Sequence, residues 1–244
     1  MTSTAVRLGN VTVQFAGHPA LHHITGAFAN GSLTAIVGPN GAGKTTLLKA
    51  IAGLAPLASG TVTADRAAIA YLPQAHRLND DLSLSVADVV LMGRWRRLGL
   101  HRAAGSEDHR DVAAALEAVG LGGFAARAVS TLSVGQRQRV LFARLMMSDA
   151  HIVLLDEPFA AIDSATTRDL LAVVRAWHQG KRTVIAVLHD LDQVRAHFPQ
   201  TLLVARQVVA WGPTHEALTS ANLDIAAALS EAPAADAPWC QSAA

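Results

Sequence analysis

The chain has 244 residues, the length of one elaborated domain or of a core that carries one inserted lobe. Twenty Lys and Arg residues against nineteen Asp and Glu residues leave a formal net charge of +1. Charged residues make up 16%, below the roughly 25% of ordinary soluble domains. This balance excludes a nucleic-acid binder that relies on bulk positive charge. Hydrophobic residues reach 51%, yet no run approaches the ~18 apolar residues of a transmembrane helix.

The N-terminus and the single cysteine bear on the compartment. No apolar segment of the kind found in a secretory signal follows Met1–Leu8. Cys240 is the only cysteine, which excludes an intramolecular disulfide and a cysteine-rich metal site. We therefore expect a cytoplasmic protein that does not itself cross a bilayer.

The first third of the chain predicts strands and one helix. Val11, Val13 and Phe15 alternate with polar residues, as in a strand, and 33–37 is a short apolar run that ends at a turn. A helix is expected from Lys44 to about Ala52. A further short strand is expected over 68–72, where Pro73 ends it.

The spacing changes in the middle of the chain and changes back after it. Residues 86–147 have helical spacing, interrupted by glycine-containing loops. Two fully apolar runs follow, at 152–155 and 184–188, with a helix predicted between them at about 166–177. Strand, helix and strand in this order predict a parallel sheet that is buried on both faces. The apolar runs 202–205 and 208–211 predict a hairpin around Arg206 and Gln207.

These elements predict an α/β fold with a mostly helical insertion. We expect one domain over residues 1–230, followed by a flexible tail at 231–244. The sheet core is expected at about 1–85 and 148–230, and the helical subdomain at about 86–147. The chain contains no internal repeat.

A glycine-rich segment lies between the strand at 33–37 and the helix at Lys44. It reads Gly-Pro-Asn-Gly-Ala-Gly-Lys-Thr over residues 38–45, which is a phosphate-binding loop in the expected strand–loop–helix context. Backbone N–H groups and the helix N-terminus favour a bound phosphate, Lys44 would reach the β- and γ-phosphates, and the Thr45 hydroxyl would ligate Mg²⁺. This loop alone leaves kinases, GTPases, motors and transporters open.

An acidic pair ends the buried strand at 152–155. Asp156 at this place is suited to hold the shell of a Mg²⁺ ion, and Glu157 to polarise a water molecule aimed at a γ-phosphate. Alone, an acidic pair also suits the start of a helix. With Lys44 upstream, the catalytic interpretation is favoured.

Leu132–Gln136, about twenty residues before Asp156, reads Leu-Ser-Val-Gly-Gln and resembles the signature sequence of the ATP-binding cassette (ABC) family. Further matches follow the family's order. Gln74 resembles the Q-loop glutamine, Asp163 lies in a segment similar to the D-loop, and His189 resembles the switch histidine. Phe15 stands where the family has an aromatic ring that stacks on adenine. The resemblance covers roughly residues 5 to 215.

The resemblance implies a phosphate-loop NTPase (RecA-like) core with a mostly parallel sheet, an antiparallel β edge and an inserted helical subdomain. It also implies ATP and Mg²⁺ as ligands and a set of site residues. The residues implied to bind ATP are Phe15, Gly38, Pro39, Asn40, Gly41, Ala42, Gly43, Lys44, Thr45 and Thr46. Those implied in catalysis are Glu157, His189, Lys44 and Gln74, those for Mg²⁺ are Thr45, Gln74 and Asp156, and the D-loop residue is Asp163.

The signature is implied to act on a second copy of the chain. Ser133, Val134, Gly135 and Gln136 would contact the ATP held by the partner subunit, because Ser133 would cap a helix whose N-terminus points outward. The resemblance therefore implies a homodimer that ATP closes. The family has two adjacent glycines here, and Val134 replaces the first. A β-branched residue disfavours positive φ, so we expect an ordinary backbone conformation and a working but slower site.

The stretch 89–100 resembles importers of zinc, manganese or iron, and more distantly those of iron chelates and cobalamin. This implies integral membrane permease subunits and an extracytoplasmic metal-binding protein as partners, no nucleic acid, and a place on the inner face of the cytoplasmic membrane. Trp95 and Leu98 are candidates for contact with the permease. Zinc is the first expected cargo and manganese the second. An importer of an iron-siderophore or cobalamin, and a soluble non-transport ABC ATPase, stay open.

Two other features admit an ordinary explanation. Arg94, Arg96 and Arg97 form a short basic cluster, expected to be a solvated face or a nucleic-acid patch. His22 and His23 are adjacent, so in a strand their side chains would face opposite sides and could not share a metal ion. We therefore expect the cargo metal to pass through a different chain.

Overall fold

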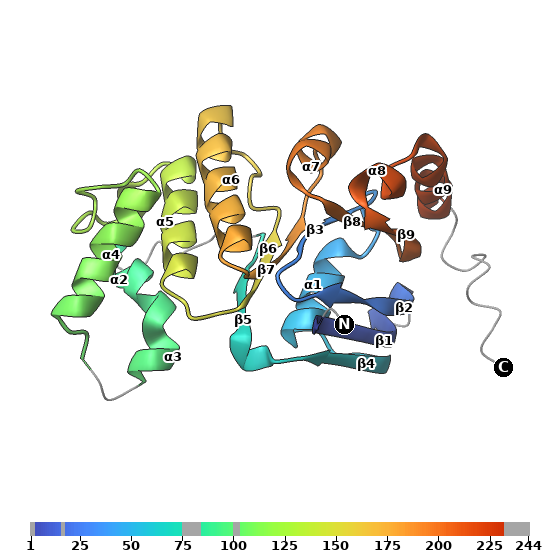
Figure 1. Ribbon diagram of the computed structural model, residues 1–244, viewed down its shortest axis with the longest axis horizontal. Coiled ribbons are helices and arrows are strands. Elements are labelled where there is room, and N and C mark those ends of the chain that lie inside the picture. The colour runs from blue at the N-terminus through green and yellow to red at the C-terminus, as the bar shows by residue number, and fades with distance from the viewer. Residues whose placement is uncertain (1–2, 16–17, 75–83, 100–102, 232–244) are drawn as a thin grey trace.

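The computed structural model describes residues 3–15, 18–74, 84–99 and 103–231; the side chains of Leu98 and Glu231 are also outside what it describes. Its sheets and helices confirm the predicted α/β fold class (Figure 1). The strands are β1 (Thr4–Phe15), β2 (His18–Ala29), β3 (Leu33–Val37), β4 (Ser59–Ala64), β5 (Ile69–Leu72), β6 (Ile152–Asp156), β7 (Thr183–Val187), β8 (Gln200–Ala205) and β9 (Gln207–Pro213). The α-helices are α1 (Lys44–Ala52), α2 (Val86–Leu91), α3 (Trp95–Leu98), α4 (Ser106–Ala118), α5 (Val134–Met146), α6 (Ser164–Gln179), α7 (Leu191–His197), α8 (Thr214–Ala217) and α9 (Ser220–Glu231).

The strands form two sheets. A six-stranded sheet has the order β5-β6-β7-β3-β8-β9, parallel throughout except for β9, which pairs antiparallel with β8. A three-stranded antiparallel sheet has the order β2-β1-β4. In β3, β6 and β7 every residue is buried, because parallel strands are covered on both faces. Their carboxyl ends meet at one edge, where α/β sheets bind ligands.

Two apolar cores lie on opposite faces of the larger sheet. One joins α1 and the antiparallel sheet to one face, with Phe28, Leu47 and Leu154 among its fully buried side chains. The other joins helices α2, α4, α5 and α6 to the opposite face, where Phe142 and Trp177 stack with ring centroids 5.5 Å apart. Helices α2 to α5 lie together at one end of the molecule, and the antiparallel sheet lies towards the other (Figure 1).

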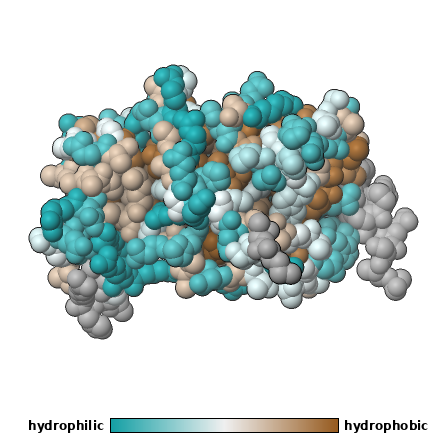
Figure 2. Space-filling view, viewed as in Figure 1, coloured by the Kyte–Doolittle hydropathy of each residue, from teal (hydrophilic) through white to brown (hydrophobic). Residues whose placement is uncertain are grey.

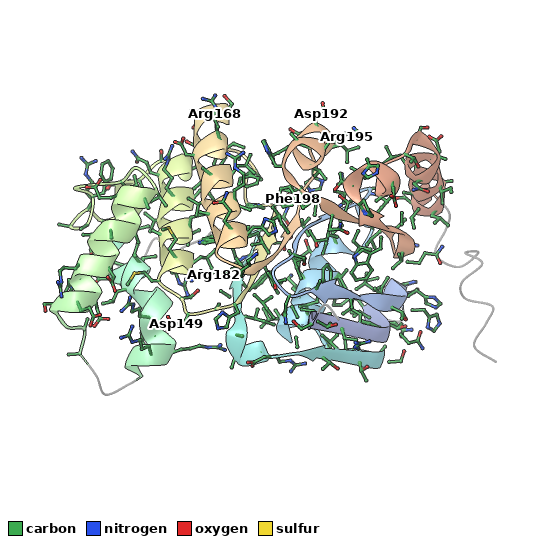
Figure 3. The ribbon with its side chains drawn as sticks, viewed as in Figure 1. Asp149, Arg168, Arg182, Asp192, Arg195 and Phe198 are labelled. Carbon is green, nitrogen blue, oxygen red and sulfur yellow. The ribbon has the colours of Figure 1, made fainter. Side chains whose placement is uncertain are left out.

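The surface is mixed rather than uniformly charged. The face seen in Figure 2 alternates hydrophilic and apolar residues, as expected for a chain with 51% hydrophobic residues. Two examples show local contacts of charged side chains. On α7, Arg195 lies 3.6 Å from Asp192, and Arg182 donates to the Ser148 carbonyl at 3.0 Å beside Asp149 (Figure 3).

The predicted elements are present, most with boundaries shifted by one or two residues, but the strand predicted from Val11 to Phe15 begins seven residues earlier, at Thr4. The strand expected at 68–72 begins at Ile69, and the strand expected at 184–188 covers 183–187. The hairpin turns at Arg206 alone, with φ 60°, while Gln207 already belongs to β9. Strands β2 and β4 and helices α7, α8 and α9 were not predicted from the sequence. Within the described residues, none of the helices has the length and apolar character needed to span a membrane. The tail expected at 231–244, with Cys240, falls outside the described residues except for the end of α9.

Candidate functional site: a nucleotide-binding edge and a separate signature helix

The phosphate loop connects β3 to α1 and needs glycine at two crowded points. Gly38 has φ 153°, and a Cβ atom there would lie 2.0 Å from the Val204 carbonyl oxygen. Gly43 has φ 90°, and a Cβ atom there would lie 2.4 Å from the Ala20 carbonyl oxygen. Any larger residue would clash with backbone at both positions. These contacts hold the loop between the β8 end and strand β2, with its N–H groups at the start of α1.

Lys44 is the first residue of α1 and is almost fully buried, with 6% of its surface exposed. Its Nζ donates to the carbonyl oxygens of Gly38 at 2.7 Å and Pro39 at 2.8 Å, so the ammonium lies against the loop. Burial lowers the pKa of Lys44, and the nearby charges of Glu157 and Asp156 oppose that shift. The cation is held beside two carboxylates at the place where the loop's N–H groups favour an anion.

Asp156 ends β6 and is fully buried. Its Oδ1 accepts from the Thr45 hydroxyl at 2.9 Å, and its Oδ2 accepts from the Tyr71 hydroxyl at 3.1 Å. Burial raises the pKa of Asp156, while the hydrogen bonds from Thr45 and Tyr71 act to lower it. The structure thus brings Thr45 and Asp156 together, as the sequence predicted, and adds Tyr71, for which no role was predicted.

The oxygen atoms of Thr45 and Asp156 fit a magnesium ion. Mg²⁺ prefers oxygen ligands and is usually held by one or two carboxylates together with substrate phosphates, not by an all-protein cage. The described residues contain no group of three or more His, Cys, Asp or Glu side chains that could hold a metal ion. Thr45 follows directly on the phosphate loop, so a metal between Thr45 and Asp156 would also face the phosphates.

Glu157 and His189 lie together beyond the same strand ends. Glu157 has φ 49°, a left-handed conformation that is uncommon for a residue other than glycine. Its Oε1 contacts His189 Nε2, and its backbone N–H donates to the Val187 carbonyl at 3.2 Å. Leu188, just before His189, donates in turn to Ile36 of β3 at 3.1 Å. Backbone hydrogen bonds across β3, β6 and β7 therefore fix the acid and the histidine beside each other.

The remaining predicted residues of this site lie around its margin. Gln74 is exposed two residues beyond β5, the neighbour of β6 in the sheet, and it is the last described residue before a gap. Phe15 ends β1 with 52% of its surface exposed, directly opposite His18 of β2. Since the Ala20 carbonyl of β2 lies against the phosphate loop, this hairpin adjoins the loop. Asn40 and Gly41 are exposed at the tip of the loop, and Thr46 is partly buried in α1.

The signature segment forms the start of α5. The Ser133 hydroxyl accepts from the Gln136 N–H at 3.3 Å, and the Gln136 side-chain oxygen accepts from the Ser133 N–H at 3.1 Å. This reciprocal pair is a capping box, as the sequence predicted for Ser133. Val134 opens the helix with 60% of its surface exposed, and its φ is not positive, as expected.

The signature helix and the phosphate loop do not share a cavity. A hollow of about 680 Å³ is lined by Ser133 to Gln136 and, from the segment similar to the D-loop, by Ala161 to Asp163. Neither Lys44 nor Asp156 lines it. Asp163 caps α6 by accepting from the Thr166 N–H at 2.8 Å, and Arg139 of α5 donates to Asp169 of α6 at 2.8 Å. The exposed helix start is thereby tied to α6 of its own chain.

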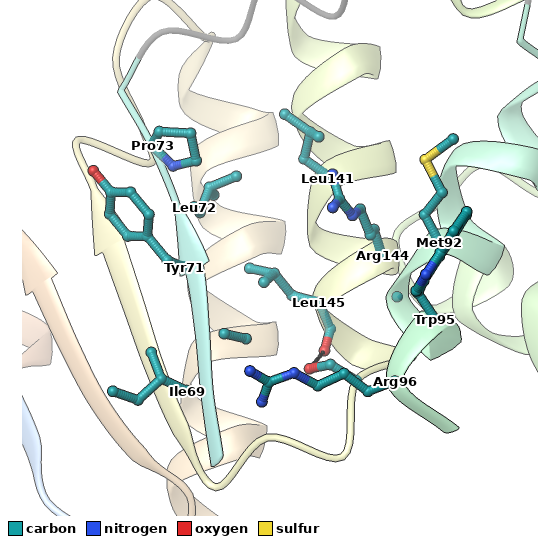
Figure 4. Close-up of a pocket in the computed structure, with 13 residues that line it drawn as sticks. Ile69, Tyr71, Leu72, Pro73, Met92, Trp95, Arg96, Leu141, Arg144 and Leu145 are labelled. Carbon is teal, nitrogen blue, oxygen red and sulfur yellow. Dashed lines mark hydrogen bonds between the residues drawn. The ribbon is translucent and has the colours of Figure 1, made fainter. Parts of the chain in front are cut away.

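A second hollow, of about 430 Å³, lies between β5, the segment before α3, and α5 (Figure 4). Trp95 forms part of its wall and is 58% exposed, as expected for a contact residue. In Figure 4, Tyr71 and Ile69 extend from β5 to the side away from Met92 and Trp95. The side chain of Leu98, the other residue expected at this contact, and Leu100 lie outside the described residues.

The basic cluster differs from both interpretations offered for it. Arg94 is largely buried, where it pairs with Asp108 at 3.0 Å and also with Asp111 of α4. Arg96 donates to the backbone carbonyl groups of Ala67 and Arg66. Arg97 is exposed. The cluster therefore joins α3 to its neighbours instead of forming one solvated basic face or a nucleic-acid patch.

The expectation for the adjacent histidines was wrong in its geometry. His22 and His23 do not face opposite sides of β2, because His23 has φ 52° at an irregularity in the pairing of β1 with β2. Their rings lie edge to face, with centroids 4.2 Å apart. His23 Nδ1 contacts the Asn10 side-chain oxygen at 2.5 Å. The pair belongs to no group of three or more metal-ligating side chains among the described residues.

Comparison with known proteins gives one family. The profile of the family described as "ABC transporter" matches residues 21–160, which contain the phosphate loop, the signature, Asp156 and Glu157. The manganese transport system ATP-binding protein MntB of Bacillus subtilis is 40% identical, over 89% of this chain and 90% of its own. The zinc transport system ATP-binding protein TroB of Treponema pallidum is 38% identical, over 89% of this chain and 85% of its own.

Solved structures agree with these relatives. A transporter described as of the metal-chelate ABC type, in an inward-facing conformation, has a TM-score of 0.81 at 30% identity, covering 91% of this chain and 88% of that one. An ATP-binding cassette in a dimeric post-hydrolysis state, bound to ADP and Pi, has a TM-score of 0.76 at 25% identity, covering 86% of this chain and 98% of that one.

Proposed function

The chain belongs to the ABC transporter family, and from this premise we propose that it is the ATP-hydrolysing subunit of an importer for a transition-metal ion, with zinc and manganese as the two cargoes to test. The observation that carries the cargo class is the similarity to a manganese and a zinc transport ATP-binding protein, at 40% and 38% identity. These two values are too close to order zinc and manganese. The chain itself would bind ATP and Mg²⁺, and the cargo metal would pass through other subunits.

In the proposed reaction, the residues at the strand ends divide the work. The phosphate loop, 38–43, and Lys44 bind the phosphates, Thr46 adds to this contact, and Phe15 stacks on the adenine. Mg²⁺ when bound would neutralise charge on the β- and γ-phosphates, with Thr45, Asp156 and Gln74 as the residues that hold it.

Glu157 orients the attacking water molecule and accepts a proton from it. The water oxygen then forms a bond to the γ-phosphorus, while the bond between the γ-phosphorus and the oxygen that bridges to the β-phosphate breaks. The contact with His189 supports this assignment, because the histidine holds the Glu157 carboxylate. His189 is itself proposed to donate a hydrogen bond to the γ-phosphate.

We further propose that two copies of the chain complete each other's sites. Ser133, Val134, Gly135 and Gln136 would contact the ATP of the partner subunit, with Asp163 of the D-loop beside them. The outward-facing start of α5 supports this, because a capped helix N-terminus favours a phosphate and the phosphate loop of the same chain does not line its hollow. The dimeric state of a relative that shares the fold supports it as well.

The groove between β5 and α5 is the proposed contact with integral membrane permease subunits, which places the protein on the cytoplasmic face of the membrane. An extracytoplasmic metal-binding protein would deliver the cargo to those subunits. Trp95, exposed in the groove wall, supports this assignment.

Co-purification with the permease should fall when Trp95 is changed to Asp and should stay unchanged for Arg97→Asp, outside the groove lining. Undiminished recovery of Trp95→Asp would contradict the contact.

The cargo is tested by elemental analysis of metal-starved cells. Cells that carry Glu157→Gln should lose one metal selectively, zinc or manganese, relative to cells with the native chain. Glu107→Gln, the same chemical change at an exposed residue of α4, is the matched control and should leave all metals unchanged.

A second candidate is an importer of a metal chelate such as an iron-siderophore or cobalamin. It is favoured by the fold similarity to the metal-chelate type transporter, with a TM-score of 0.81. Unchanged zinc and manganese together with lost chelate uptake would select it. Unchanged levels of every metal and of chelate uptake would instead select a soluble ABC ATPase without a transport role.

A further inference from the structure

Tyr71 lies between the Asp156 carboxylate and the strand that forms one wall of the groove beside Trp95. It lies in β5, the edge strand of the larger sheet, where it pairs with Leu154 of β6. Alternate residues of a strand share a face, so Leu154 and Asp156 share one face, and the Tyr71 side chain extends along that face towards Asp156. Its hydroxyl donates to Asp156 Oδ2 at 3.1 Å.

The hydroxyl is the part of Tyr71 that packing does not explain. The ring contributes to the apolar core beside α1, and a phenylalanine ring would fill the same volume. A partly buried hydroxyl costs free energy unless it is hydrogen-bonded, and this one donates to a carboxylate. Tyr71 is also the only tyrosine of the chain.

The two oxygen atoms of Asp156 are fixed from opposite sides of the site. Thr45, from the phosphate-loop helix, holds Oδ1, and Tyr71, from the edge strand, holds Oδ2. With both contacts, the plane of the carboxylate is set. Without the Tyr71 hydroxyl, the carboxylate is free to turn about its last bond, and a buried oxygen atom loses its hydrogen bond.

We propose that Tyr71 is a positioning residue of the metal–nucleotide site, whose hydroxyl holds the Asp156 carboxylate in the orientation that Mg²⁺ bound to ATP requires. This inference rests on the proposed magnesium site and is independent of the cargo. All of β5, Tyr71 included, contributes to the lining of the groove that holds Trp95. The carboxylate is therefore anchored to a strand that also forms the groove wall.

The test is equilibrium binding of adenylyl imidodiphosphate, an ATP analogue that is not hydrolysed, to the full chain with excess EDTA and with excess Mg²⁺. The ratio of the two dissociation constants measures the coupling between metal and nucleotide, separately from catalysis. For Tyr71→Phe, we expect the dissociation constant in EDTA to stay within about twofold of native. The tightening by Mg²⁺ should fall about five- to tenfold, the size expected for the net contribution of one hydrogen bond.

Thr201→Val is the matched control. Thr201 is a fully buried residue of β8, its hydroxyl is paired with Thr214 at 2.9 Å, and it lies at the beginning of its strand, away from the phosphate loop. This variant should lower the melting temperature without changing the metal-dependent tightening. Tyr71→Phe with native tightening, or with equal weakening in EDTA and in Mg²⁺, would overturn the positioning role. If the native chain showed no tightening by Mg²⁺, the proposed magnesium site itself would be wrong.

Discussion

The two nucleotide-related regions of this chain differ in how far the chain completes them. At the phosphate-loop edge, Lys44 and Asp156 are buried and hydrogen-bonded within the chain, with 6% and 0% of their surfaces exposed. At the signature, the capping box is formed, yet Val134 is 60% exposed beside an open hollow.

This difference shows which part of the chemistry one chain can do. Buried, paired groups give a phosphate site that exists before any partner arrives. An exposed helix start has its N–H groups and dipole arranged for an anion that its own chain does not bring. Under the proposed function, the chain carries a nearly complete site and one half of another, which is the arrangement expected if each copy completes its partner.

The largest effect is expected at the phosphate-loop edge, when the proposed general base Glu157 is removed. Glu157→Gln keeps the size of the side chain and removes the proton acceptor, so we expect ATP hydrolysis to fall at least about 100-fold, the contribution of a positioned general base. Binding of ATP should persist, because Lys44 and the loop are unchanged. Phosphate release and equilibrium binding check these two points. Turnover near that of the Glu107→Gln control would remove Glu157 from the role of base.

The signature region, which is one half of the proposed shared site, should lose its function when a carboxylate is introduced at the exposed start of α5. Gly135→Asp places a negative charge where the partner's phosphate is expected, and we expect hydrolysis to fall at least about tenfold. Nucleotide binding to the chain's own phosphate loop should stay within about twofold of native, because that loop does not line the signature hollow. Gly105→Asp introduces the same charge at the start of α4 and should leave hydrolysis unchanged. If nucleotide binding by Gly135→Asp fell as much as its hydrolysis, the phosphate loop and the signature would act on the same nucleotide within one chain.

In the absence of nucleotide, the buried Asp156 carboxylate at the phosphate-loop edge should lower the free energy of unfolding. Burial raises the pKa of Asp156, which means that folding disfavours its charged form at neutral pH. Asp156→Asn removes that charge at nearly constant size and should raise the free energy of unfolding by about 1 kcal/mol, while hydrolysis is lost. Denaturant titration at neutral pH checks the sign. A less stable Asp156→Asn chain would show that the hydrogen bonds from Thr45 and Tyr71 outweigh burial.

The smallest effect is expected in the signature region, where a change at Val134 should alter turnover only slightly. Val134→Gly supplies the first glycine of the signature and removes a β-branched side chain from the exposed helix start, so turnover should rise by up to about threefold. Glycine also weakens a helix N-terminus slightly, which limits the gain. Steady-state hydrolysis at saturating ATP measures the change. Lower turnover would show that Val134 makes a productive contact.

The sequence predicted those parts of the molecule in which local chemistry and fold agree. The phosphate loop, the apolar strands that end at Val37 and Asp156, and the cap at Ser133 each carry their signal within a few residues. Strand β2 was missed because Pro19, Gly26 and the left-handed His23 interrupt the alternation that marks a strand.

Contacts between segments far apart in the chain carry no such local signal. The bond between Tyr71 and Asp156 joins residues 85 positions apart, and it depends on the pairing of β5 with β6. The salt bridges of Arg94 with Asp108 and Asp111 likewise depend on how α4 packs, which is why the basic cluster was misread as a surface feature.

The association state of the Glu157→Gln chain, with and without ATP, tests the central claim of two complementary regions most directly. Light scattering coupled to size exclusion should give a monomer without nucleotide and a dimer with ATP, and the same chain with Gly135→Asp added should remain a monomer while still binding ATP. A Glu157→Gln chain that binds ATP and stays a monomer would contradict the claim, as would a dimer that Gly135→Asp leaves intact.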